Sequence, residues 1–231
     1  LHLGLCGSGS PMPDPTRAGP CVAVVAGQRL FVVDSGTGST RNLSLMNLPP
    51  ARVEAVFLTH YHSDHIADLG ELMLQRWAGG PAKRPVPVYG PTGVDQVVGG
   101  FEAAYALDRG YRVAHHGPAV MPPAFPVPHD PATPAVGYIF EYKGRKLVVS
   151  GDTALSQRLE TAARGADLLA HEGLSHKLVG LQREAAVKAG RDNLAHIMHD
   201  ILSYHTDPKD VGALAQRAGV REVLFYHVIP P

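Results

Sequence analysis

The sequence predicts an α/β fold, because short apolar runs rich in β-branched residues alternate with segments of helical periodicity. Four of these apolar runs are followed within two residues by a metal-type side chain, at His60, Asp152, His171 and His227. The carboxyl ends of strands are where α/β folds place their chemistry. Chance would scatter such residues over helices and both strand ends, so the pattern predicts one site at one edge of the fold.

The composition indicates a globular protein. The chain has 231 residues, of which 45% are hydrophobic and 18% are charged. Its 21 basic residues balance its 21 acidic ones, which gives no bulk electrostatic argument for nucleic-acid binding. No apolar run approaches the length of a membrane-spanning helix. The chain begins at Leu1 without methionine, which weakly favours an exported or periplasmic protein over a cytoplasmic one.

The N-terminal third predicts strands and turns. Residues 1–6 form a short strand, and residues 21–26 and 29–33 form a hairpin that turns at Gly27-Gln28. Cys6 and Cys21 flank the turn between the first two of these strands and could pair in an oxidising compartment. Asp34 follows the hairpin, and two interpretations stay open for it: it caps a turn, or it accepts a hydrogen bond from a ligand histidine.

The segment His60-Tyr61-His62-Ser63-Asp64-His65 organises the middle of the chain. Residues 53–59 predict a buried strand before it, and a helix begins near Asp64 or His65 and continues to about Trp77. The elements expected next are an edge strand at 86–89, a helix at 92–107, and an irregular loop or lid at 108–128 that contains His115 and His116.

The C-terminal part predicts two strands and a turn, then alternating helices and strands. The expected elements are strands 136–142 and 146–149, helix 155–163, strand 166–170 ending at His171-Glu172-Gly173, helical segments within 176–203, a helix capped by Asp207 and Gly219, and strand 223–226. We expect His171, His196 and His199 to be structural, although the roles of His196 and His199 stay open.

These residues predict a pair of metal ions. The first ion would be held by His60, His62 and His129, the second by Asp64, His65 and His227, with Asp152 bridging them. His115 or His116 could replace His129 as the third histidine ligand of the first ion. A hydroxide between two Zn²⁺ ions would be the nucleophile, and Mn²⁺ or Fe²⁺ also suit mixed nitrogen and oxygen ligands.

The motif His60-x-His62-x-Asp64-His65, followed by His129, Asp152 and His227, resembles the metallo-β-lactamase superfamily over essentially the whole chain. This resemblance implies a single domain over residues 1–231 with a four-layer αββα sandwich. The turn at residues 7–10, His171-Glu172 and His205-Thr206 are similar to the ribonuclease Z and arylsulfatase-like branch. The branch implies three catalytic residues, Asp64, Glu172 and His205. Glu172 would orient His205, which acts on the leaving group.

Departures from the family pattern bear on the substrate. Only 22 residues separate His129 from Asp152, too few for the long basic arm with which ribonuclease Z grips tRNA. With zero net charge, this favours a small phosphodiester or aryl sulfate as substrate and makes nucleic acid an unlikely partner. Three alternatives stay open. They are hydrolysis of a lactone, carboxylic ester or β-lactam, tRNA 3′-end processing without an arm, and a metal-binding module without turnover. A homodimer is left open.

Overall fold

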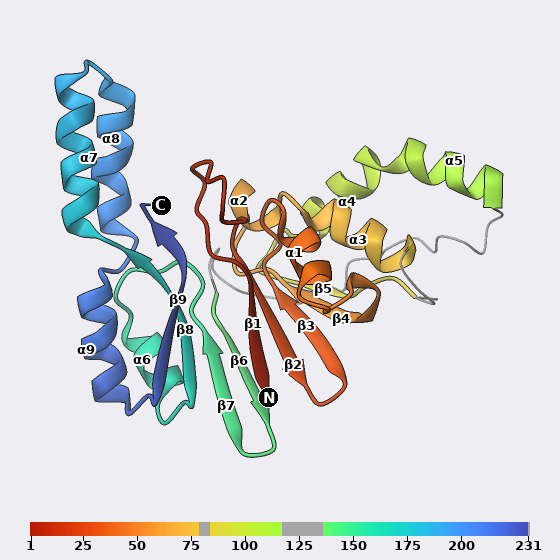
Figure 1. Cartoon of the computed structure of the whole chain (residues 1–231), viewed down its shortest axis with the longest axis horizontal. Helices are drawn as coiled ribbons and strands as arrows, with labels where there is room; N and C mark the ends of the chain where they lie inside the picture. The colour runs from red at the N-terminus through yellow and green to blue at the C-terminus, as the bar shows by residue number, and fades with distance from the viewer. Residues whose placement is uncertain (79–83, 117–135, 231) are drawn as a thin grey trace. The chain divides into compact units, whose positions relative to one another are not determined.

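The computed structural model describes residues 1–78, 84–116 and 136–230, which fold into two compact units. The first unit contains residues 1–7 and 16–136, and the second contains residues 8–15 and 137–231. Each unit is built around one β-sheet with helices attached to it (Figure 1). This is the mixed α/β class that the sequence predicts. No helix in the described part of the chain is both long and apolar enough to cross a bilayer.

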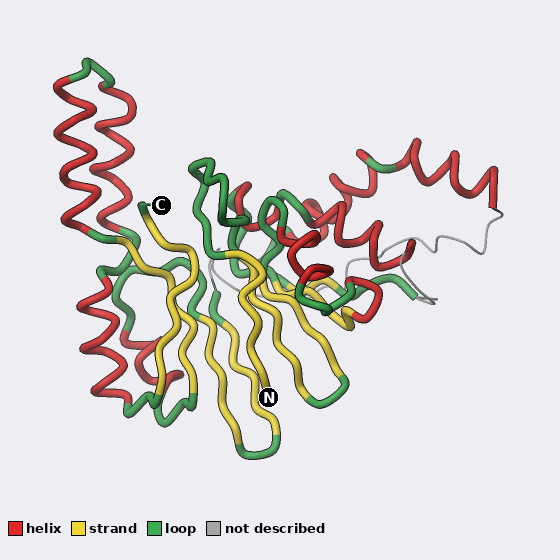
Figure 2. The backbone as a smooth tube through the Cα atoms, in the orientation of Figure 1, coloured by secondary structure: helices red, strands yellow, loops and turns green. Residues whose placement is uncertain are grey.

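The first unit has a five-stranded sheet in the order β1-β2-β3-β4-β5. Its strands are β1 (His2–Gly7), β2 (Cys21–Ala26), β3 (Arg29–Val33), β4 (Val53–Phe57) and β5 (Val88–Tyr89). The β2–β3 hairpin pairs in the expected register, with Ala26 opposite Arg29, and the short β5 lies at the sheet edge as its proline predicts. β4 lies parallel to both β3 and β5, so their carboxyl ends share one edge. The strands are drawn in yellow in Figure 2.

Short helices complete the first unit: α1 (Ser39–Leu45), the 3₁₀ turn η1 (Pro50–Arg52), α2 (Ser63–Ile66), α3 (Leu69–Ala78), α4 (Val94–Ala104) and α5 (Ala106–His116). Their apolar faces join the sheet in one buried core that includes Val32, Val56, Leu58, Leu72 and Val98. Cys6 and Cys21, which the sequence left unassigned, form a disulfide within this core.

Two expectations for the first unit are wrong. The single helix expected up to Trp77 is broken after α2, because the Asp68 N–H donates to Ser35 O at 2.9 Å and the Asp68 carboxylate accepts from Thr40 N at 2.7 Å. The irregular loop expected from residue 108 is helical as far as His116 in α5, and residues 117–128 lie outside the described residues. The prolines that suggested a loop all follow that helix, so they do not interrupt it.

The second unit has a four-stranded sheet in the order β6-β7-β8-β9. β6 (Tyr138–Tyr142) and β7 (Arg145–Val149) form the expected hairpin, and β8 (Leu168–Leu174) and β9 (Glu222–Ile229) extend it in parallel. β8 and β9 both continue beyond the expected ends, through Glu172 and His227. The candidate site residues Glu172 and His227 therefore lie within strands rather than in loops.

The helices of the second unit are α6 (Gln157–Ala163), α7 (His176–Lys188), α8 (Asp192–Asp200), the 3₁₀ turn η3 (Ile201–Ser203) and α9 (Pro208–Ala218). α6 and α9 cover β7 and β8 through a core that includes Leu159, Leu169 and Leu214. α9 has the expected caps, with Asp207 accepting from Lys209 N at 3.0 Å and Gly219 in the left-handed conformation. α7 and α8 form an antiparallel pair beyond the ends of β8 and β9 (Figure 1).

Candidate metal centre

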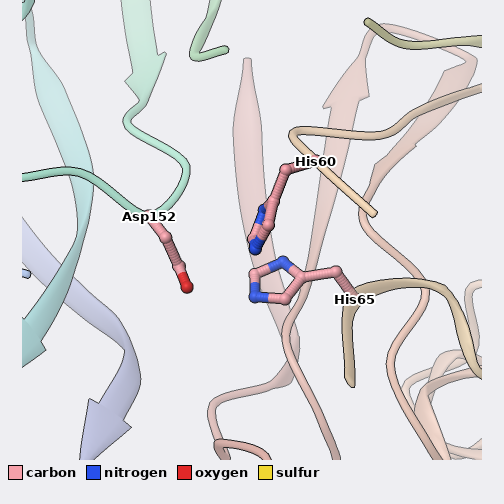
Figure 3. Close-up of side chains that lie close together, drawn as sticks. All are labelled: His60, His65 and Asp152. Carbon is pink, nitrogen blue, oxygen red and sulfur yellow. The ribbon is translucent and has the colours of Figure 1, made fainter. Parts of the chain in front are cut away.

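The histidine-rich loop of the first unit starts where β4 ends and runs into α2. His60 Nε2 lies 2.9 Å from His62 Nδ1. The rings of His60 and His65 lie side by side at an angle of 55°, with centroids 4.1 Å apart (Figure 3). The two ring nitrogens of His60 and His62, 2.9 Å apart, need a proton or a cation between them. Bonds of 2.0–2.1 Å to a tetrahedral zinc ion would separate ligand atoms by about 3.3 Å, close to this spacing.

Asp64 joins this group from the first turn of α2. Its Oδ2 lies 3.7 Å from His65 Nε2, and both side chains are buried. His60 thus lies beside both His62 and His65, and His65 lies beside Asp64, so four of the predicted ligands come together in the tight strand-to-helix turn of the first unit. The nitrogen and oxygen donors of the four are those that zinc and its first-row neighbours prefer.

Asp34 supports the His65 ring from β3. Its Oδ2 lies 2.9 Å from His65 Nδ1, and it also accepts a hydrogen bond from Thr59 Oγ1 at 2.8 Å. Its Oδ1 accepts from the Thr59 backbone N–H at 2.8 Å. The carboxylate favours the tautomer of His65 with its proton on Nδ1, in which Nε2 is the atom that would bind a metal ion. Of the two interpretations left open for Asp34, the contact with a candidate ligand histidine is the one observed.

The backbone after Asp34 holds α2 in place. Ser35 N donates to His65 O at 2.8 Å. Gly36 lies so close to α2 that a Cβ atom there would be 2.4 Å from Asp64 O. The glycine is required because any side chain would push the Asp64 segment away. The glycine-rich turn thus positions the segment that carries the candidate ligands.

The second unit holds a separate group of candidate ligands. Ligand atoms of Asp152, His205 and His227 all lie within 4.8 Å of one another. His227 Nε2 is 3.4 Å from Asp152 Oδ2, which matches the ligand spacing expected around a tetrahedral zinc ion. The rings of His205 and His227 are stacked, with centroids 5.5 Å apart. Figure 3 shows the Asp152 carboxylate on the loop that follows β7.

A bulge in β9 directs His227. His171 pairs with Phe225 and Gly173 pairs with Val228, so Tyr226 and His227 together face the single residue Glu172. His227 has a φ of 49°, and Asp34 in the first unit has a φ of 60°. Residues other than glycine adopt this strained conformation rarely, and they cluster at functional sites.

Glu172 and His205 meet as the branch resemblance implies. Glu172 Oε2 lies 3.3 Å from His205 Nδ1, and Glu172 Oε1 accepts from Thr206 N at 2.7 Å. Glu172 is fully buried, and His205 is 7% exposed. An anionic partner at Nδ1 favours a proton there and orients Nε2 away from the carboxylate.

The other predicted residues are placed as follows. His129 lies outside the described residues. His171 is buried in β8 with Nδ1 2.7 Å from Glu172 O, and burial lowers the pKa of its imidazole. The Tyr61 hydroxyl donates to Pro91 O, and burial together with Asp95 raises the pKa of Tyr61 to about 12. His196 pairs with Asp200 across one turn of α8, at 3.2 Å.

Two further residues support the site and were not predicted from the sequence. Thr59 is buried and links Asp34 to the loop, and its Oγ1 lies 3.1 Å from His60 Nδ1. A hydroxyl directly before the first histidine was the available signal. Tyr226 accepts a hydrogen bond from Gly151 N at 3.0 Å and so fixes the loop that carries Asp152. Nothing in the sequence links these two distant positions.

The profile of the metallo-beta-lactamase superfamily matches residues 14–197 of the chain. This chain belongs to the metallo-β-lactamase superfamily, as the His60–His65 motif indicates, and is a metal-dependent hydrolase of that class. Its relatives within the superfamily include ribonucleases Z. Ribonuclease Z from Mycobacterium bovis (strain BCG / Pasteur 1173P2) is 35% identical over 255 residues, which cover 100% of this chain and 86% of the relative. Ribonuclease Z from Mycolicibacterium gilvum (strain PYR-GCK) is 33% identical, with 100% and 85% covered.

Solved structures agree on the fold. Human tRNase Z, short form, superposes with a TM-score of 0.67 at 19% identity, covering 98% of this chain and 92% of that chain. The metallo-beta-lactamase fold protein YhfI from Bacillus subtilis gives a TM-score of 0.64 at 19% identity, covering 98% and 85%. The α/β fold class of the superfamily is therefore confirmed.

The relatives correct the expectation about partners. We expected a small-molecule ester substrate and considered nucleic acid unlikely, but the matching relatives are enzymes named for RNA. The expectation was wrong because net charge is an average over the whole surface, whereas a nucleic-acid site needs only a local basic region. The arylsulfatase-like half of the branch assignment has no support among these relatives.

Proposed function

We propose that this chain is a ribonuclease Z-type endonuclease that hydrolyses one phosphodiester bond at the 3′ side of precursor tRNA. The observation that carries the proposal is full-length similarity to ribonuclease Z, 35% identical over 100% of this chain, with a ligand-type motif in each unit. The alternative that the sequence left open, tRNA processing without the usual arm, thus becomes the main hypothesis.

The proposed metal ligands are those the sequence predicts: His60, His62, His129, Asp64, His65, Asp152 and His227. The spacings of 2.9, 3.7 and 3.4 Å between candidate ligand atoms support all of these except His129, which lies outside the described residues. Two zinc ions bound by this set would supply Lewis acidity toward the phosphate and the activated water for attack. Manganese or iron in the same shell would supply the same chemistry.

His205 is proposed to donate a proton to the departing ribose oxygen. Its Nδ1 faces the buried Glu172 carboxylate at 3.3 Å, which orients the ring and leaves Nε2 as the atom that transfers the proton. Thr206 N holds the other Glu172 oxygen at 2.7 Å, which prevents the carboxylate from turning away. Breaking the phosphorus–oxygen bond then leaves a neutral hydroxyl rather than an alkoxide.

The test uses a precursor tRNA transcript with a 3′ trailer. The metal-loaded protein is expected to cut the transcript once, to lose this activity on chelation, and to regain it with zinc or manganese. Asp152→Asn is expected to abolish cleavage, while Asp192→Asn, an exposed carboxylate on α8, is expected to leave it unchanged. Turnover of bis(p-nitrophenyl) phosphate by a metal-loaded protein that leaves the transcript intact would overturn the RNA assignment.

A further inference from the structure

The second unit contains a groove that the proposed chemistry does not use. Its volume is about 540 Å³, within the range of sites that hold small organic groups. Four segments form its walls: residues 12–13, one face of α7, the start and middle of α8, and residues 229–230 at the end of β9. Because all four belong to the second unit, the groove is a property of that unit alone.

Apolar groups make up most of the lining. Met12, Met198 and Ile229 contribute the larger side chains, and alanines on α7 leave the space between them open. Two polar side chains interrupt this surface: Gln182 on α7, and Arg191, which precedes α8. Among the described residues, Arg191 is the only charged one that lines the groove. No described residue forms an ion pair with Arg191.

The groove is built onto the strand that carries His227. Ile229 follows His227 by two residues, and Ile229 O accepts from Ser175 N at 2.8 Å. Val228 N donates to Ser8 O at 3.1 Å, which ties the segment containing Met12 to the same strand end. Two residues of extended chain span at most about 7 Å. A substrate that reaches His227 can therefore also reach the groove.

This surface matches a single nucleotide. A base offers two apolar faces and a hydrogen-bonding edge, and an adjacent phosphate offers negative charge. We propose, on the basis of the proposed function, that the groove binds one unpaired nucleotide of the RNA substrate beside the scissile bond. The base packs against Met198 and Ile229, the Gln182 amide bonds its edge, and the Arg191 guanidinium binds a phosphate oxygen.

Two variants test this proposal in kinetics. Ala185→Leu fills the groove from an exposed position on α7, and Arg191→Gln removes its charge. Each is expected to raise KM for the precursor transcript by about tenfold and to leave kcat/KM for bis(p-nitrophenyl) phosphate, which has no base, within twofold. Arg191→Gln is also expected to reduce the salt slope of RNA binding by about one. The controls are Ala185→Ser, which leaves the groove open, and Arg183→Gln, an exposed cation outside it.

Methyl NMR separates failure of the groove from failure of the proposed function. Adenosine monophosphate added to the metal-free chain is expected to shift the Met12 and Met198 methyl signals and not those of Met46 and Met73, which belong to the first unit. Shifts without RNA cleavage would support the groove and refute the endonuclease. Cleavage with unchanged KM in both groove variants, or no shift at Met12 and Met198, would overturn the groove.

Discussion

Asp34→Asn is the sharpest test of how the first unit prepares its ligands. The substitution keeps the shape of the side chain but replaces one acceptor oxygen with an amide donor. If the amide nitrogen faces His65 Nδ1, now 2.9 Å away, the imidazole proton must move to Nε2, where it blocks the ligand position. If the amide turns over, its nitrogen faces the Thr59 backbone N–H, which now bonds the other carboxylate oxygen at 2.8 Å. Neither orientation satisfies the buried groups.

Loss of such a supporting group lowers metal affinity by roughly 10- to 100-fold, or about 1.4–2.8 kcal/mol. The assay is competition for zinc between the protein and a fluorescent chelator of known affinity. Asp68→Asn is the matched control, since Asp68 accepts from Thr40 N at 2.7 Å in the same unit and contacts no ring nitrogen in the described residues. Wild-type affinity in Asp34→Asn, or an equal loss in Asp68→Asn, would refute the reasoning.

Three further predictions concern stability and catalysis. Gly36→Ala should lower the melting temperature and the zinc affinity, because its Cβ would lie 2.4 Å from a carbonyl oxygen of α2. Gly99→Ala is the control: it has open space around it in α4 and should stabilise the protein by up to about 1 kcal/mol in thermal unfolding. Asp167, whose pKa is lowered to about 2 by a backbone N–H and then by arginine side chains, stabilises the fold above about pH 4, and that stability is lost as pH falls toward 2. Asp167→Asn should therefore flatten acid unfolding of the metal-free protein between pH 4 and pH 2, and an unchanged curve would contradict this. His205→Ala should reduce kcat for RNA by roughly 10²–10⁴-fold, and Glu172→Gln should reduce it less and change the pH–rate profile; a change confined to KM would argue against both roles.

Local chemistry made part of the site predictable. His60, His62, Asp64 and His65 lie within six consecutive positions after a recognisable strand, so their convergence needs only a tight turn. The caps of α9 were likewise local, because Asp207 and Gly219 act on their own helix ends.

Non-local features could not be predicted. The bulge that turns His227 depends on the register between β8 and β9, which are separated by more than forty positions in the chain and paired by the whole sheet. The same applies to Tyr226, whose hydroxyl supports Gly151 from another strand. α5 was missed because prolines beyond its end dominated the composition of that stretch. The substrate was misjudged because net charge carries no information about where charges lie.

A zinc titration of the metal-free protein, followed by cleavage of the precursor transcript, tests the central claim most directly. We expect no cleavage without metal and full cleavage only when about two equivalents per chain have bound. Cleavage by the metal-free protein, or a maximum already reached at one equivalent, would contradict a paired-ion ribonuclease.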